Sequence, residues 1–177
     1  MQMDEPEPAR IEDFYLTGLR TDSRSETPNF YTFLVAQGGQ LLPLVANGQI
    51  VLFTHLDLAS IALSRAGIDA EFRALSLENV YLVDVAGALY LLERESADPQ
   101  RLIANTLDLC AKILTSLGIG VPSIFADALI DLGNHVDTNE LYGDFIERES
   151  ITRPRAIDGV RWCLGTVFSV ARIVTRE

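Results

Sequence analysis

In residues 30–36 two sets of side chains alternate with a period of two, which is typical of a β-strand. One set is Tyr31, Phe33 and Val35, and the other is Thr32, Leu34 and Ala36. Two dipeptides farther along, Gly38-Gly39 and Asn47-Gly48, favour tight two-residue turns between antiparallel strands. Pairing across the first turn places Val35 opposite Leu42. The pattern therefore predicts a three-stranded antiparallel meander.

Pro43 lies in the middle of the central strand of this meander. Proline has no backbone N–H for the hydrogen-bond ladder, so we expect either a bulge there or an early divergence of one neighbouring strand. Beyond the proline, the second turn places Val45 opposite Ile50.

A second hairpin is predicted from residues 80–85 and 89–92, joined by a turn at Ala86-Gly87. Both of its faces are apolar, so helices or another subunit must cover it on both sides. Asp84 interrupts the apolar pattern, and we expect this residue at a sheet edge near the turn. The alternative is a buried carboxylate, which requires a partner.

Helical spacing of apolar residues, with capping residues at the ends, predicts helices in the remaining chain. Thr54 and Asp57 suit the start of the first helix and Gly67 suits its end. A short strand is predicted at residues 70–73. The later helices are expected at residues 96–117, 122–133, a short segment from Asp137 and Glu140, and 154–175.

Strands in the first half and helices in the second predict an α+β fold, in which an antiparallel meander plus hairpin is covered by a helical C-terminal half. The length of 177 residues suits one domain. Residues 1–28 are polar, acidic and proline-containing, and predict a flexible arm with at most a short ordered piece at 11–19. The sheet region at 29–95 and the helical region at 96–177 are expected to form one compact domain.

The composition excludes several classes of function. The chain is 48% hydrophobic, and 25 acidic against 14 basic residues give a net charge of −11. This balance argues against binding to a nucleic-acid backbone. No signal peptide or membrane-length apolar segment is visible, and Cys110 and Cys163 have no metal or redox spacing. We expect a cytoplasmic protein with reduced cysteines and no cofactor.

Asp127, Asp131 and His135 recur at helical spacing and form the one candidate metal site. Gly133 and Asn134 weaken this hypothesis, because they favour an end of the helix before the histidine. The favoured interpretation is a solvated helix edge followed by a loop histidine.

His55 is a candidate general base, with Asp57 or Asp84 to orient it. A structural residue at a helix N-terminus is the favoured interpretation, because the positive end of the helix dipole disfavours a protonated histidine. No nucleophile motif is present, so the sequence leans away from an enzyme.

Basic residues gather in one segment of the sequence. This group can bind an anion or form ion pairs with nearby acidic residues, and internal ion pairs are favoured. Its members are Arg148, Arg153, Arg155 and Arg161, and the acidic residues are Asp144, Glu147 and Glu149. The C-terminal helix is apolar on more than one face, which favours either a core position or a dimer contact. The predicted interaction residues are Tyr81, Val83, Tyr90, Trp162, Phe168 and Ile173.

Residues 30–63 resemble the N-terminal part of SseB-type proteins, in which a short meander ends in a strand that runs directly into a helix. The matching residues are Val51-Leu52-Phe53-Thr54, followed by a helix with Ala59, Ala62 and Leu63. The Asn-Pro-Gly segment expected later in that family is absent. The resemblance implies a small accessory domain and transfers no functional residues.

The leading hypothesis is a non-catalytic binding or regulatory module that acts through protein–protein contacts and forms a homodimer. A second hypothesis is an acidic protein of the immunity or mimic type that neutralises a basic partner. The third is a small enzyme or metal-binding protein that uses Asp127, Asp131 and His135.

Overall fold

The computed structural model describes residues 11–65, 80–94, 100–137 and 152–176. Within these residues, one mixed sheet of seven strands packs with helices on both faces. Strands lie mostly in the N-terminal half and helices mostly in the C-terminal half, so the predicted α+β class is confirmed. No helix in the described ranges is long and apolar enough to cross a membrane.

The strand order in the sheet is β4-β5-β2-β1-β6, with β3 beside β2 and β7 beside β5. Strand β1 is antiparallel to β2 and parallel to β6. The strands are β1 (Ile11–Arg20), β2 (Phe30–Gln37), β3 (Gln40–Pro43), β4 (Val45–Ala46), β5 (Gln49–Phe53), β6 (Tyr81–Asp84) and β7 (Arg172–Val174).

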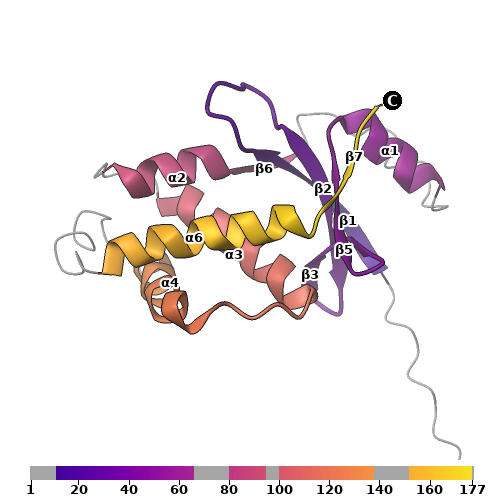
Figure 1. Cartoon of the computed structure of the whole chain (residues 1–177). Coiled ribbons are helices and arrows are strands. Elements are labelled where there is room, and N and C mark those ends of the chain that lie inside the picture. Colours follow the sequence, from indigo (N-terminus) through magenta and orange to yellow (C-terminus); the bar gives the residue numbers. More distant parts are fainter. Residues whose placement is uncertain (1–10, 66–79, 95–99, 138–151, 177) are drawn as a thin grey trace, which may run out of the picture.

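The helices form two unequal layers around the sheet. Helix α1 covers one face, while α2, α3, α4 and α6 gather on the other side (Figure 1). The helices are α1 (Leu56–Arg65), α2 (Val85–Glu93), α3 (Gln100–Ser116), α4 (Ser123–Asp137) and α6 (Thr152–Ser169).

Period-two alternation divides the side chains of the sheet between two cores. Leu34 and Leu52 are buried against the four-helix layer. Their neighbours Phe33 and Phe53 are buried on the face of α1, with ring centroids 6.1 Å apart. Adjacent residues therefore belong to different cores, and both faces of the central strands are buried.

Both predicted turn registers are confirmed. Val35 pairs with Leu42, and Val45 pairs with Ile50. Asn47 at the second turn has a φ of 53°, the left-handed conformation that an Asn-Gly hairpin turn requires.

The strand at Pro43 is not the continuous central strand of a meander. It stops at Pro43, after which β4 pairs with β5 rather than β2. Strands β2 and β5 then meet directly, with Tyr31 opposite Phe53. The proline thus divides one predicted strand into two short ones, as its missing N–H requires.

The short ordered piece expected at residues 11–19, within the N-terminal arm, is a ten-residue strand of the sheet. Residues 11–20 form β1, which lies between β2 and β6 inside the sheet. Thr17 pairs with Thr32 and Gly18 pairs with Leu82. These partners are distant in sequence, so the local acidic composition concealed a strand that long-range pairing stabilises.

The predicted second hairpin is wrong. Only residues 81–84 form a strand, and the chain turns at once into α2. Val85, Ala88 and Leu92 are buried along one side of this helix, a spacing of three and four rather than two. Because almost every residue in this segment is apolar, periodicity alone did not separate a strand from a helix.

Asp84 starts α2 and joins it to the sheet. Its carboxylate accepts a hydrogen bond from the Gly87 N–H at 2.9 Å and forms a two-point ion pair with Arg20 at the end of β1. Asp84 lies on the edge strand, as expected, but it is buried and it has the partner that burial demands. A Cβ atom at Gly87 would lie 2.8 Å from the Asp84 Cγ, so only glycine fits there.

Two predicted helix ends differ from the structure. Helix α4 continues past Gly133 to Asp137, and the last helix ends at Ser169 rather than near residue 175. After Ser169 the chain forms β7, parallel to β5, with Leu52 opposite Ile173. The predicted elements at residues 70–73 and 140, and the helix end at Gly67, lie outside the described residues.

Removal of the Asp84 carboxylate should destabilise the fold. Asp84→Ala loses both the ion pair and the helix cap, and we expect the free energy of unfolding to fall by about 3 kcal/mol. Asp84→Asn keeps an acceptor for the Gly87 N–H, so its loss should be smaller by about 1 kcal/mol. Urea denaturation measures both values. Glu93→Gln, at an exposed ion pair with Arg161, is the control and should leave the midpoint unchanged; equal midpoints for all three variants would contradict this role of Asp84.

Candidate functional site

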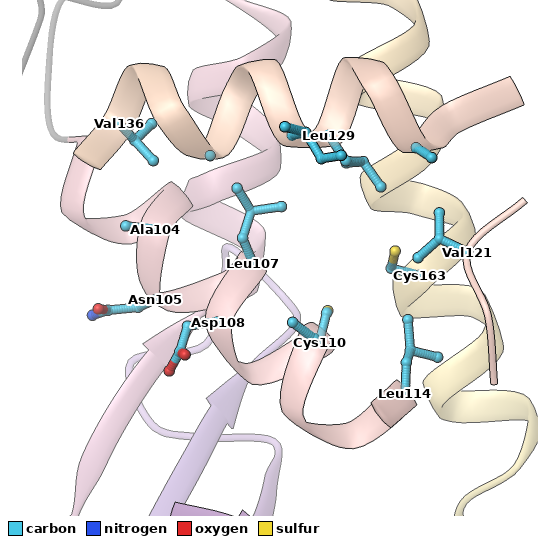
Figure 2. A pocket seen from close by; sticks show the side chains of 14 residues that line it. Ala104, Asn105, Leu107, Asp108, Cys110, Leu114, Val121, Leu129, Val136 and Cys163 are labelled. Atoms are coloured by element: carbon cyan, nitrogen blue, oxygen red, sulfur yellow. The ribbon is translucent and has the colours of Figure 1, made fainter. Parts of the chain in front are cut away.

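An apolar pocket of about 600 Å³ opens in the helical layer, with α3 and α4 as its main walls (Figure 2). Val121 from the α3–α4 connection and Cys163 from α6 complete the wall. We call this site the α3–α4 pocket. Its lining consists of Ala104, Asn105, Leu107, Asp108, Cys110, Ala111, Leu114, Val121, Ala126, Leu129, Ile130, Gly133, Val136 and Cys163.

Small residues on the facing sides of the two helices create the space. On α3 these residues are Ala104 and Ala111, and on α4 they are Ala126 and Gly133. Both pairs are seven residues apart, so each occupies one side of its helix. A Cβ atom at Gly133 would meet nothing within 4 Å, which shows how much room lies beside this position.

The packing of α4 against α6 is much closer. A Cβ atom at Gly159 would lie 3.0–3.2 Å from three side-chain atoms of Leu129. Phe125 and Trp162 extend the same contact, with ring centroids 6.4 Å apart. Helix α4 is therefore fixed to α6, and the pocket remains between α4 and α3.

Few of the described residues that line the pocket are polar. Among them, Asn105 and Asp108 alone have polar side chains apart from the two thiols, and both extend away from the cavity centre in Figure 2. Asp108 forms an ion pair with Lys112 one turn later on α3. The described part of the pocket wall thus offers an apolar surface without a set of converging polar groups.

Cys110 and Cys163 contribute thiols to this wall. Burial raises the pKa of the Cys110 thiol to about 12, and the nearby Cys163 adds to the effect. Burial also raises the pKa of Cys163. Both thiols are protonated at neutral pH, so they act as small apolar groups here.

The structure does not assemble the predicted metal site. The α4 helix continues through His135, but Asp127 and Asp131 are exposed while His135 is buried. Each step of four residues turns the side chain about 40° farther around the helix, and at His135 this stripe reaches the core. Among the described residues, no group of three His, Cys, Asp or Glu side chains could hold a metal ion.

The two carboxylates proposed to orient His55 are bonded to arginines instead. His55 is exposed just before α1. Asp57 accepts a hydrogen bond from Arg176 at 2.8 Å, and this interaction lowers the pKa of Asp57. Asp84 is held by Arg20 at the opposite edge of the strand order. The Thr54 hydroxyl donates to the Val174 carbonyl, so this N-terminus of α1 is tied to β7.

Two arginines of the predicted basic group, Arg153 and Arg161, bind other parts of the fold. Arg153 donates to the carbonyl oxygens of Leu92 and Glu93 at the end of α2. Arg161 pairs with Glu93 at 2.6 Å and with Asp158. Arg155 is exposed. Arg148 and the acidic run Asp144, Glu147 and Glu149 lie outside the described residues.

The predicted interaction residues are dispersed. Tyr81, Tyr90 and Ile173 are 45–50% exposed, whereas Val83 is fully buried. Trp162 and Phe168 are half-buried against Phe125 and Phe30. Sequence reasoning therefore found exposed apolar residues on β6, α2 and β7, but it missed the pocket. The available signal was the pair of small residues seven apart on each of two neighbouring helices.

No family model and no curated protein matches the sequence. Among solved structures, the chain is similar to the SatS C-terminal domain, crystallised in complex with bromine, with a TM-score of 0.63 and 15% sequence identity. The match covers 91% of this chain and 94% of that chain. At this level of identity the likeness establishes a shared fold.

Thiol chemistry tests whether the pocket wall is closed around Cys110. At pH 8, a thiol with a pKa of about 12 has about a thousandfold fewer thiolates than an ordinary thiol with a pKa of 9.0. In a Cys163→Ser variant, burial remains as the larger cause of the raised pKa, so we expect the disulfide reagent DTNB to react with Cys110 much more slowly in the folded protein than in urea. The absorbance of the released thiolate gives both rates. Comparable rates would contradict the buried position.

Proposed function

We propose that the protein is a non-catalytic binding module that acts through protein–protein contacts, with the α3–α4 pocket as its binding site. The observation that carries this proposal is the open apolar pocket of about 600 Å³. Pockets of this size with mostly apolar walls are common binding sites.

The energetics favour an occupant. Ile130 in the wall is 59% exposed, and Val121 is 37% exposed. Water in such a space has few polar groups to bind, so an apolar side chain gains free energy by displacing it. Burial contributes about 25 cal/mol for each Å² of apolar surface removed from water.

The positions of the candidate catalytic groups support a non-catalytic role. His55 is exposed just before α1, and Asp84 is engaged by Arg20 and the start of α2. The described residues that line the pocket include the two protonated thiols and one carboxylate, Asp108, which is paired with Lys112. These groups suit recognition better than proton transfer.

Site-specific photocrosslinking tests this function. A benzophenone amino acid at Ile130, used in an extract of the native cells, should give discrete adducts with partner proteins. The same amino acid at Ile61, which is 45% exposed on α1, should not give these adducts. Mass spectrometry identifies the products.

Two glycine variants provide the matched control. Gly133 and Gly165 are both helical, and a Cβ atom at either position meets nothing within 4 Å, but only Gly133 lines the pocket. Gly133→Leu should fill the space and abolish the adducts, whereas Gly165→Leu should preserve them. Adducts that survive Gly133→Leu would refute the pocket as the binding site.

Self-association through β6 is the second candidate. Among the described residues, β6 pairs with β1 alone, and a strand edge without a partner favours pairing with a second copy. Tyr81, Leu82 and Tyr90 on β6 and α2 are 44–50% exposed. Exposed apolar residues along a strand edge favour pairing between chains.

A charge substitution at this edge tests dimer formation. We expect the wild-type protein to sediment as a dimer at high concentration and Leu82→Lys to sediment as a monomer. Ile61→Lys on α1 is the control, because it places the same charge at an equally exposed position. A wild-type protein that stays monomeric would rule out this candidate.

A further inference from the structure

We propose that the occupant of the α3–α4 pocket is an amphipathic α-helix of a partner protein, with an apolar stripe in the pocket and basic residues on the flank that faces α4. This inference rests on the proposed function, since it specifies the partner of the same site. The conformation, the length and the charge of the occupant follow from separate observations.

The walls of the pocket favour a helix over an extended peptide. Both main walls are helices, and their backbone N–H and C=O groups are already bonded within each helix. An extended segment placed there would leave its own backbone groups unpaired against an apolar surface. A helix satisfies its backbone internally and presents only side chains, so it can enter the site without this cost.

The length of the pocket matches a few helical turns. Its walls run from Ala104 to Leu114 on α3 and from Ala126 to Val136 on α4. Ten residues of helix span about 15 Å. A partner helix of about three turns lying along the walls would present apolar side chains at i, i+3 or i+4, and i+7.

A small-molecule ligand fits the site less well. Such sites hold their ligands through a few converging polar groups. Here Asn105 and Asp108 extend away from the centre, and Asp108 is paired with Lys112. The two thiols are weak hydrogen-bond groups. The side chains of a helix need no such groups, because their position is fixed by the helix itself.

The charges near the pocket are asymmetric. On α3, Asp108 and Lys112 neutralise each other. On α4, Asp127 and Asp131 are exposed one turn apart, next to the pocket residue Ile130, and neither forms an ion pair with a described residue. Arg101 lies beyond the opposite end of the pocket, in the first turn of α3. With the net charge of −11, this distribution favours Lys or Arg on the flank toward α4.

Designed peptides of about twelve residues, which span three turns, test the inference by fluorescence anisotropy with the full chain. The first peptide has leucines at helical spacing and lysines on the flanks. The second replaces the lysines with glutamates. The third has the composition of the first with the leucines at every second position. We expect the first peptide to bind and the other two to bind at least tenfold more weakly.

Variants of the protein locate the interaction. Asp127→Asn/Asp131→Asn should weaken binding of the lysine peptide about fivefold. Asp22→Asn/Asp57→Asn removes the same total charge from exposed positions on the far part of the fold, and it should change binding less than twofold. Gly133→Leu should abolish binding, whereas Gly165→Leu should not.

The outcomes separate this inference from the proposed function. Equal binding of the lysine and glutamate peptides, or equal effects of the two double variants, would overturn the basic flank. Equal binding of the third peptide would overturn the helix. If no peptide binds but the neutral dye N-phenyl-1-naphthylamine binds and its binding is lost in Gly133→Leu, the site takes small molecules and the inference fails. If Gly133→Leu also leaves the dye unaffected, the pocket itself fails as a binding site.

Discussion

The contact between Leu129 and Gly159 determines the shape of the helical layer. Because position 159 has no side chain, Leu129 packs directly on the backbone of α6, and α4 follows α6 closely. The same leucine forms part of the wall of the α3–α4 pocket. The tight contact of Leu129 with α6 and the alanine and glycine residues beside it on the same face of α4 are therefore two parts of one arrangement, which leaves an apolar space open to solvent.

Local signals predicted much of the fold. The Asn47-Gly48 turn fixed the pairing of Val45 with Ile50, because this dipeptide strongly favours one backbone conformation. Pro43 likewise signalled the break in its strand, because proline lacks the N–H that the ladder needs. Two features could not be predicted this way. The place of residues 11–20 inside the sheet depends on distant partners, and α2 is too uniformly apolar for its period to be visible.

The candidate site was less accessible from sequence than the fold. A titratable cluster such as Asp127, Asp131 and His135 attracts attention in a sequence, but in the structure the two carboxylates are exposed and the histidine is buried. The pocket exists because the residues at positions 104, 111 and 133 are small (Ala104, Ala111 and Gly133). Alanine is also common in helices that line no pocket, so these residues give no clear signal in the sequence. The role of these small residues appears only when two helices are placed face to face (Figure 2).

Methyl NMR of the full chain, titrated with the lysine-flanked helical peptide, tests the central claim most directly. The account predicts saturable shifts at the methyl groups of Leu107, Leu129 and Ile130, with the methyl groups of Ile61 on α1 unchanged. Shifts that are confined to Leu82 and its neighbours on β6, or the absence of saturable shifts anywhere, would contradict the assignment of the α3–α4 pocket as the binding site.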